Sequence, residues 1–131
     1  MGLTNFPNGI NGGVSVFSAG TAIGGVVVGA QTSVALAASG GAALDPLVDQ
    51  TSLYTITPTA SETLTASSAP DGYYVTIKVL TSGTSSFTLT FGTGFVTTGT
   101  LATGTASAKV FTITFVGDGT NLNEVARTTA M

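Results

Sequence analysis

The chain contains no cysteine, no histidine and no tryptophan among its 131 residues. The lack of cysteine excludes disulfides, thiolate metal sites and thiol redox chemistry. The lack of histidine removes the commonest transition-metal ligand and general base. We therefore expect no metal, no cofactor and no catalytic residues.

Charged residues are also scarce. Three Lys or Arg and six Asp or Glu make up 7% of the chain and leave a net charge of −3, whereas about 25% is usual. Three cations cannot form the basic face that nucleic acid requires, so we expect no nucleic-acid partner. The mean hydropathy of +0.50 is too high for a disordered chain and poorly suited to a free monomer. The composition predicts a surface that a partner or further copies of the chain cover.

A membrane span is not expected, although residues 2–44 carry no charged side chain. A spanning helix needs about 20 mainly apolar residues. The densest apolar run here, residues 22–30, contains three glycines and is flanked by polar residues. The first residues lack the Lys or Arg of a secretory signal, so we expect synthesis in the cytoplasm of the producing cell.

The composition changes near residue 45 and predicts two parts. Residues 1–44 are rich in Gly, Ala and Val and are interpreted as an extended arm, and residues 45–131 as a β domain. Glycine-rich chain loses the most conformational entropy on ordering, so the arm is expected to become ordered against neighbouring subunits. The apolar residues expected to make these contacts are Phe6, Ile10, Val14, Val16, Phe17, Val26, Val27 and Val28.

Residues 45–131 follow a strand pattern. Apolar and polar residues alternate over 73–80, 86–91 and 111–115, and turn signals rich in Gly, Pro, Asp and Ser separate these runs. Short strands spaced by about 8–12 residues are typical of a sandwich or barrel, so the predicted fold is an all-β, jelly-roll-like β-sandwich. The predicted core consists of Tyr54, Ile56, Leu64, Tyr73, Val75, Ile77, Val79, Phe87, Leu89, Phe91, Phe95, Phe111, Ile113 and Phe115.

One short sequence is nearly repeated. Residues 87–91 read Phe-Thr-Leu-Thr-Phe, and residues 111–115 read Phe-Thr-Ile-Thr-Phe. A solenoid would show three or more units at a fixed period. The pair is therefore interpreted as two similar strands of one sandwich.

Carboxylates are the only conventional acid–base groups. Two acids can hydrolyse a glycosidic bond when they face each other about 5–9.5 Å apart, and Asp45 with Asp49 or Asp118 with Glu124 are the candidate pairs. We interpret Asp45 instead as the N-cap of one helical turn, with Pro46 in the first position, and Asp118 as a turn residue.

Three further candidate sites have a structural interpretation that we favour. Residues 118–124 offer several oxygen ligands, but the residue order of a calcium loop is absent. Ser107 near Lys109 has no oxyanion element beside it. Tyr54, Tyr73 and Tyr74 could stack on a sugar, but Tyr73 and Tyr74 point to opposite faces of a strand, so at most one of these two is expected to be exposed.

Residues 87–95, 98–105 and 109–127 together resemble a β module found in virion proteins of tailed bacteriophages. Such proteins include capsid decoration (cement) proteins, head fibres and tail fibres. The most recognisable part is Val-x-Asp-Gly-Thr-Asn-x-Asn-Glu-Val at 116–125, although related modules often have Trp where this chain has Leu122. Residues 3–10 also look like the start of small phage head proteins.

The resemblance implies a structural protein without enzymatic activity. Small decoration proteins of this type tend to be jelly rolls that sit as dimers or trimers over capsomer junctions, with an arm across their neighbours. We therefore expect a homo-oligomer that binds the major capsid protein on the capsid exterior after synthesis in the host cytoplasm. The alternative is a head- or tail-fibre or spike module that binds a host-surface glycan.

Overall fold

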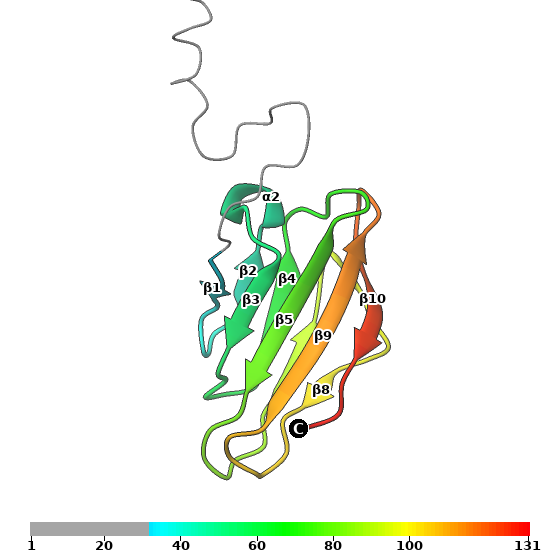
Figure 1. Cartoon of the computed structure of the whole chain (residues 1–131). Helices are drawn as coiled ribbons and strands as arrows, with labels where there is room; N and C mark the ends of the chain where they lie inside the picture. The colour runs from blue at the N-terminus through cyan, green and yellow to red at the C-terminus, as the bar shows by residue number, and fades with distance from the viewer. Residues whose placement is uncertain (1–31) are drawn as a thin grey trace, which may run out of the picture. The chain divides into compact units, whose positions relative to one another are not determined.

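The computed structural model describes residues 32–131 (Figure 1). Strands make up 43% and helix 4% of this part, which is therefore all-β, as the sequence predicts. The elements are β1 Val34–Ala35, β2 Ala42–Leu44, α2 Pro46–Asp49, β3 Leu53–Ile56, β4 Glu62–Ala66, β5 Tyr74–Leu80, β6 Thr88–Phe91, β7 Phe95–Val96, β8 Leu101–Ala102, β9 Val110–Gly117 and β10 Leu122–Arg127.

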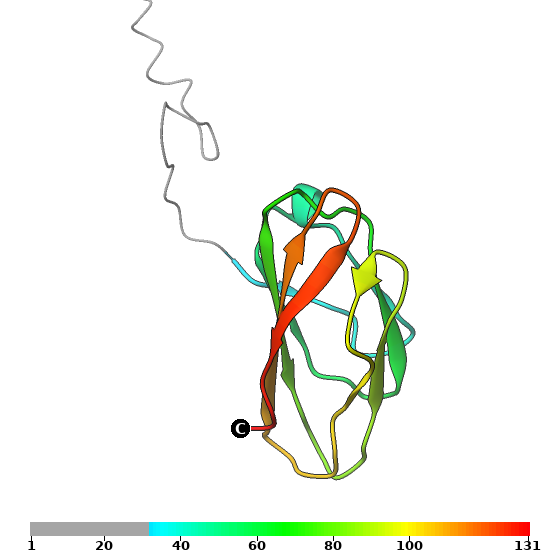
Figure 2. The same ribbon diagram turned by 90° about the vertical axis from the view of Figure 1, so that its right-hand side faces the viewer.

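The strands form two sheets that face each other. Sheet A has the order β1-β3-β5-β9-β10-β7, and sheet B has the order β2-β4-β6-β8. Figure 2 shows these two layers nearly edge-on. From β1 to β8 the chain gives successive strands alternately to sheet A and sheet B, and only β9 and β10 follow each other within one sheet.

The first three turns within residues 32–131 stack in parallel. In sheet A, Val34 of β1 lies beside Tyr54 of β3, which lies beside Ile77 of β5, so 20 and then 23 residues separate the partners. In sheet B, β2, β4 and β6 are likewise parallel neighbours. Each turn thus adds one strand to each sheet, which is a solenoid-like arrangement.

This parallel stacking differs from the predicted jelly roll, which is built from antiparallel strands. The jelly-roll arrangement is not confirmed. Alternation of apolar and polar residues places side chains on two faces of a strand and carries no information on the direction of the neighbouring strand.

The C-terminal strands close the stack. β9 pairs antiparallel with both β5 and β10, and β6 pairs antiparallel with β8. β5 and β9 share the longest ladder, from Tyr74 beside Val116 to Leu80 beside Val110. The centre of sheet A is therefore a long antiparallel pair, while β1 and β7 lie at its edges.

The apolar core fills the space between the two sheets. Most of the predicted core residues are buried, but Tyr73, Phe87, Phe91 and Phe95 are only partly covered. Phe91, Phe95 and Phe115 meet at ring-centroid separations of 5.0–5.8 Å. Buried apolar residues that the prediction omitted are Leu44, Ala69, Leu101 and Leu122.

The folded body begins before residue 45, where the composition changes. The compact unit starts at Thr32, and both β1 and β2 lie within residues 32–44. Leu44 is fully buried, and Val34 and Leu36 pack against the core. These residues belong to the sheets because they continue the parallel stack, even though their composition matches the preceding arm.

Candidate functional site

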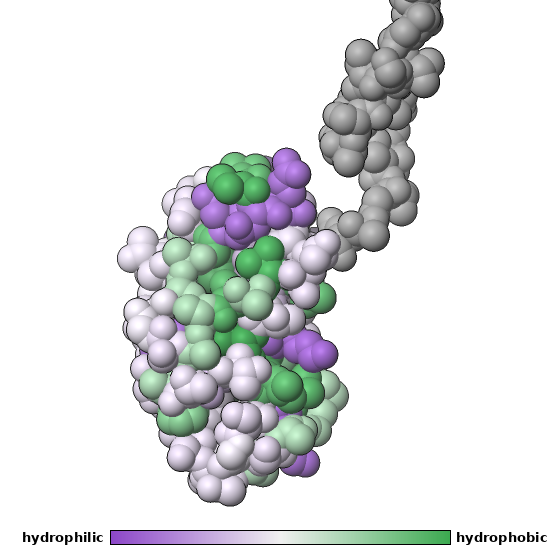
Figure 3. Space-filling model, turned by 90° about the vertical axis from the view of Figure 1, so that its left-hand side faces the viewer, coloured by the Kyte–Doolittle hydropathy of each residue, from purple (hydrophilic) through white to green (hydrophobic). Residues whose placement is uncertain are grey.

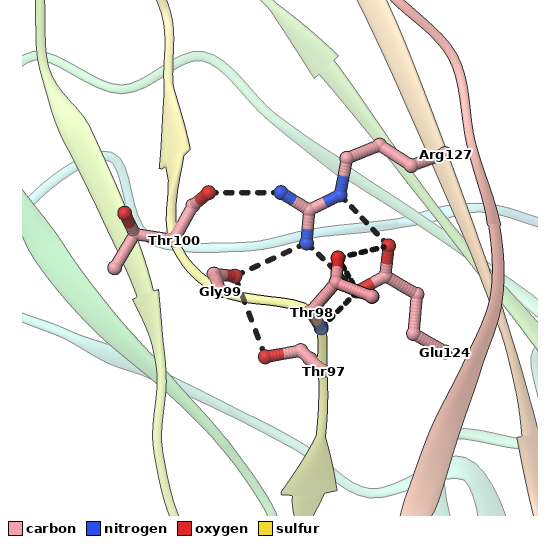
Figure 4. Close-up of polar contacts among 6 residues, drawn as sticks. All are labelled: Thr97, Thr98, Gly99, Thr100, Glu124 and Arg127. Carbon is pink, nitrogen blue, oxygen red and sulfur yellow. Dashed lines mark hydrogen bonds and ion pairs between the residues drawn. The ribbon is translucent and has the colours of Figure 1, made fainter.

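The best-connected polar cluster of the described residues joins β10 to the loop between β7 and β8 (Figure 4). Arg127 donates from Nε and Nη2 to the two carboxylate oxygens of Glu124, at 2.8 Å each. The same guanidinium donates to the carbonyl oxygens of Thr100 and Gly99, at 2.8 and 3.1 Å. Thr98 donates its backbone N–H to Glu124 at 3.0 Å and its hydroxyl at 3.2 Å.

A β-bulge brings the two charged side chains together. Residues three apart on a regular strand point to opposite faces, but β10 has a register shift between Glu124 and Ala126. The extra residue, Val125, is 52% exposed, whereas the side chains of Glu124 and Arg127 are 5% and 20% exposed. The bulge thus re-aims Arg127 toward the same side as its partner.

The cluster of Glu124, Arg127 and Thr98, which we call the clamp, connects β10 of sheet A to the loop that leads into sheet B. Burial acts to raise the pKa of Glu124, but the hydrogen bonds and charge of Arg127 and the donors of Thr98 outweigh it, and the pKa falls below its usual value. The guanidinium also lies 5.6 Å from the ring centroid of Phe91 in sheet B. Both carboxylate oxygens of Glu124 already accept hydrogen bonds from Arg127. We therefore assign this carboxylate a structural role.

Asp45 and Asp49, the first candidate acid pair, hold the short helix α2 in place. Asp45 Oδ1 accepts hydrogen bonds from the Val48 N–H at 3.3 Å and from the Ser68 hydroxyl at 2.6 Å, so the predicted N-cap is confirmed. The Ser68 hydrogen bond lowers the pKa of Asp45. Asp49 accepts a 2.7 Å hydrogen bond from the hydroxyl of Tyr54.

Tyr54 anchors α2 to the core. Its side chain is fully buried. Burial raises its pKa, and the hydrogen bond to Asp49 adds to the shift. The predicted core position of Tyr54 is confirmed, and its hydroxyl is committed to α2.

Asp118, a member of the second candidate pair, organises a turn, as predicted. Its Oδ1 accepts from the N–H groups of Thr120 and Asn121 at 2.9 and 2.7 Å, and its Oδ2 accepts from the Asn123 amide at 2.7 Å. The Asn121 N–H contributes most to lowering the pKa of Asp118. These hydrogen bonds occupy the carboxylate with its own loop, as in an Asx-turn.

The remaining candidates do not converge on one site. Tyr74 is 60% exposed, whereas Tyr73 is half-buried against the core, which confirms that at most one of them is exposed. Ser107 accepts a hydrogen bond from the Gly83 N–H at 3.3 Å. Within residues 32–131, no group of three or more acidic side chains is placed to hold a metal ion. No helix in this range is long and apolar enough to cross a membrane.

Glu62 is a buried acid that the sequence analysis did not identify. It is 7% exposed on β4, and neither of its carboxylate oxygens has a hydrogen-bond partner. Burial raises its pKa, and the Gly41 backbone N–H, which is not within hydrogen-bond geometry of either oxygen, acts in the opposite direction. The sequence carried one signal, because residue 62 occupies an inward position in the alternation that buries Leu64.

The outer face of sheet A is nearly free of charge. Thr76 and Thr114 lie side by side, with their hydroxyls 3.3 Å apart, and Lys78 is the charged residue among the outward positions of β5. Exposed apolar side chains on the strands of sheet A are Leu53, Tyr74, Leu80, Val96 and Val125. Such a face can pack against another protein without removing many charges from water.

The predicted contact residues of the arm lie outside the described residues. They are Phe6, Ile10, Val14, Val16, Phe17, Val26, Val27 and Val28, and all precede Thr32.

Comparison of the chain with protein-family models, with curated proteins and with solved structures finds no match.

Proposed function

We propose that the protein is a structural component of a tailed-phage virion that decorates and stabilises the capsid. In this proposal the β body docks on the outer surface of the shell, and the uncharged N-terminal arm contacts the major capsid protein and sister subunits. The protein has no enzymatic role, binds neither nucleic acid nor membrane, and reaches the capsid exterior after synthesis in the host cytoplasm.

The observation that carries the proposal is the weakly polar outer face of sheet A. It presents threonines and exposed apolar side chains such as Leu53, Tyr74 and Leu80, with Lys78 among them. Fully burying a large apolar side chain contributes about 1.5–3 kcal/mol. Repetition over a shell multiplies such modest contacts. The sequence resemblance to virion β modules, which spans β6 to β10, supports the same assignment.

The finer fold assignment is part of the proposal. A jelly-roll-like body would place this protein among small decoration proteins, and the two facing sheets are compatible with that architecture. The parallel order β1-β3-β5 instead favours a body in which the first strands stack as in a solenoid. Assembly as a dimer or trimer is likewise proposed, because the low charge imposes little repulsion between copies.

The test is attachment to purified capsid shells. Phe17→Asp places a charge among the proposed arm contacts and should reduce attachment by about tenfold or more, because an unpaired carboxylate is costly to bury. Ser18→Asp adds the same charge one position away from the predicted contact and is the matched control. Deletion of residues 2–31, which leaves both sheets complete, should abolish attachment. Full attachment of the deletion variant would overturn the role of the arm.

The alternative, a fibre or spike module that binds a host glycan, is favoured only by the exposure of Tyr74. If it holds, Tyr74→Ala should abolish binding to host-surface polysaccharide. Leu80→Ala, another exposed apolar residue of β5, should leave such binding intact. Absence of glycan binding by the unmodified chain argues for decoration.

A further inference from the structure

Glu62 is the only ionisable residue on the strands of sheet B, since β2, β6 and β8 carry none. The residue is 7% exposed, and neither of its carboxylate oxygens has a hydrogen-bond partner within residues 32–131. Burying a polar group without a partner costs free energy, and the cost is far larger when the group is charged. The closed fold therefore opposes the ionisation of this side chain.

No charged side chain within residues 32–131 compensates Glu62. Burial raises its pKa, and no charge is among the influences on it. The connections beside it, residues 36–41 and 57–61, contain no ionisable residue, and neither do β1, β7 and β9. Figure 3 faces the side of the molecule on which β1 lies, and the middle of this side is mostly apolar or neutral. The ionisable side chains on the other strands of sheet A have other partners or are exposed: Tyr54 is hydrogen-bonded to Asp49, Tyr74 and Lys78 are exposed, and Glu124 pairs with Arg127. The ionised carboxylate can therefore be stabilised only by reaching water.

The segment beside Glu62 is held by few contacts. Residues 37–43, which we call the strap, lead from β1 into β2 and read Ala-Ala-Ser-Gly-Gly-Ala-Ala. None of these residues is buried, and β2 is an edge strand that pairs only with β4. The Ala38 carbonyl accepts hydrogen bonds from the N–H and the hydroxyl of Thr59, at 2.8 and 3.2 Å. Because the strap buries no large side chain, its local opening requires little free energy.

Two glycines lie in the middle of the strap, and a fixed residue lies at each of its ends. Gly40 and Gly41 have φ values of +85° and +90°, a left-handed conformation that glycine adopts readily. Before the strap, Leu36 donates its N–H to a carbonyl of β3. After it, Leu44 is fully buried, and its carbonyl accepts a 2.8 Å hydrogen bond from the Ser67 N–H. The strap can therefore leave β4 while β1 and α2 stay in place.

We propose that the strap is a proton-controlled closure of sheet B, which stays on β4 while Glu62 is protonated and opens when Glu62 ionises. Opening gives up the pairing of β2 with β4 and the hydrogen bonds of Ala38, whose backbone groups then bind water. In exchange, the unpaired carboxylate is no longer buried. Opening also exposes the backbone edge of β4, and such an edge is a template for pairing with another strand. The exposure of this edge thus depends on pH, in the isolated chain and without any capsid.

Amide hydrogen exchange of the full chain, from below pH 4.5 to neutral pH, tests the closure. The rates of the strap amides that pair with β4, divided by the intrinsic rates of unprotected amides at each pH, give the opening constant. In the open state Glu62 has its ordinary pKa of 4.5, and in the closed state its pKa is raised. The opening constant should therefore rise by about tenfold per pH unit above 4.5 and level off at the closed-state pKa. In Glu62→Gln, which is neutral at every pH, it should stay constant.

Two results of this experiment would overturn the proposal. The first is a ratio of opening constants, unmodified chain to Glu62→Gln, that does not change with pH. The second is a set of strap amides that exchange no faster than the amide of Ile77 at the centre of sheet A. In that case the strap would open only when the whole body unfolds.

A matched pair of glycine variants tests the strap without changing Glu62. A Cβ at Gly40 would meet no atom within 4 Å, but the φ of +85° strains an alanine there. Gly83, in the loop after β5, has the same open space and a φ of +72°. Gly40→Ala should raise the opening constant of the strap by about fivefold or more, because opening relieves the strain, and should keep its pH dependence. Gly83→Ala should leave the opening constant unchanged, and equal effects of the two variants on the strap would overturn the proposal.

Discussion

The two halves of the described chain are held together differently. From β1 to β6 the strands of each sheet stack in parallel, and each contact joins residues at least 20 positions apart. From β9 to the end, the strands form an antiparallel hairpin with β5 on its other side, and a buried ion pair ties the hairpin to the loop before β8. Polar connections in the first half are hydrogen bonds such as those of Asp45 with Ser68 and of Asp49 with Tyr54, whereas the second half also has the ion pair.

The contrast accounts for the open edge at β1, beside which no further strand of residues 32–131 lies. Parallel turns leave an edge open wherever the stack stops, since each turn relies on the next for its pairing. The C-terminal half ends that stacking because β9 runs antiparallel to β5 and β10. Glu124 and Arg127 of β10 then hold the loop that crosses from β7 to β8. The largest effects of substitution on stability are therefore expected at the clamp and the smallest at the open edge.

Arg127→Met should have the largest effect. It leaves the Glu124 carboxylate, 5% exposed, without its cation, and breaking a buried pair costs about 3–5 kcal/mol. Chemical denaturation measures the loss. The double variant Glu124→Leu/Arg127→Met should recover a large part of it, and a double variant as unstable as the sum of both single variants would contradict the clamp.

Gly117→Ala should cost about 3 kcal/mol. A Cβ at residue 117 would overlap the carbonyl oxygen of Pro70 and lie 2.9 Å from backbone atoms of Ala69, so the loop before β5 must move. Gly119→Ala is the matched control in the same turn. It meets no atom within 4 Å, and its φ of +89° should cost only about 1 kcal/mol. Equal losses in thermal unfolding would contradict a steric cause.

Glu62→Leu should stabilise the parallel half by about 2 kcal/mol, because it removes a buried carboxyl group that has no hydrogen-bond partner. Denaturation at neutral pH measures the gain. Leu64→Ala, two residues further on the same inward row, is the contrasting control and should destabilise the protein by about 3 kcal/mol. A loss of stability in Glu62→Leu would mean that the carboxylate has a partner in the assembled protein.

Glu62 and the carboxylates of the C-terminal half should respond to pH with opposite signs. Since the folded-state pKa of Glu62 is raised, its contribution is fully present below its unfolded pKa of 4.5 and is lost as pH rises through the folded value. The pKa values of Asp118 and Glu124 are lowered, so their contributions are present above their unfolded values of 3.8 and 4.5 and are lost on acidification. The stability of Glu62→Gln relative to the unmodified chain should therefore grow as pH rises above 4.5. A pH-independent difference would contradict the burial of Glu62.

Val34→Ala should have the smallest effect, about 1 kcal/mol, because Val34 is only partly covered at the edge. Ile77→Ala, in the same row of sheet A but fully buried, should cost about 3 kcal/mol. Thermal unfolding at several protein concentrations compares the two. A cost for Val34→Ala that grows with concentration would show that a second copy covers this position.

Local chemistry determined much of the protein before its tertiary structure was considered. The alternation over residues 73–80 and 111–115 was enough to identify strands and their inward residues, because a strand places successive side chains on opposite faces. The cap at Asp45 and the turn at Asp118 were also predictable, since each depends on hydrogen bonds within a few residues. The scarcity of charged side chains on the surface likewise follows from the composition.

Only the tertiary structure decided how these pieces combine. Strand direction depends on which segments meet across 20 residues or more, and the same alternation fits parallel and antiparallel neighbours, so the stack of β1, β3 and β5 was not predicted. The pairing of Glu124 with Arg127 required a bulge at Val125 that no sequence pattern marked. The burial of Glu62 and the inclusion of residues 32–44 in the body arose for the same reason. Each depends on distant chain segments that supply the opposite wall of the core.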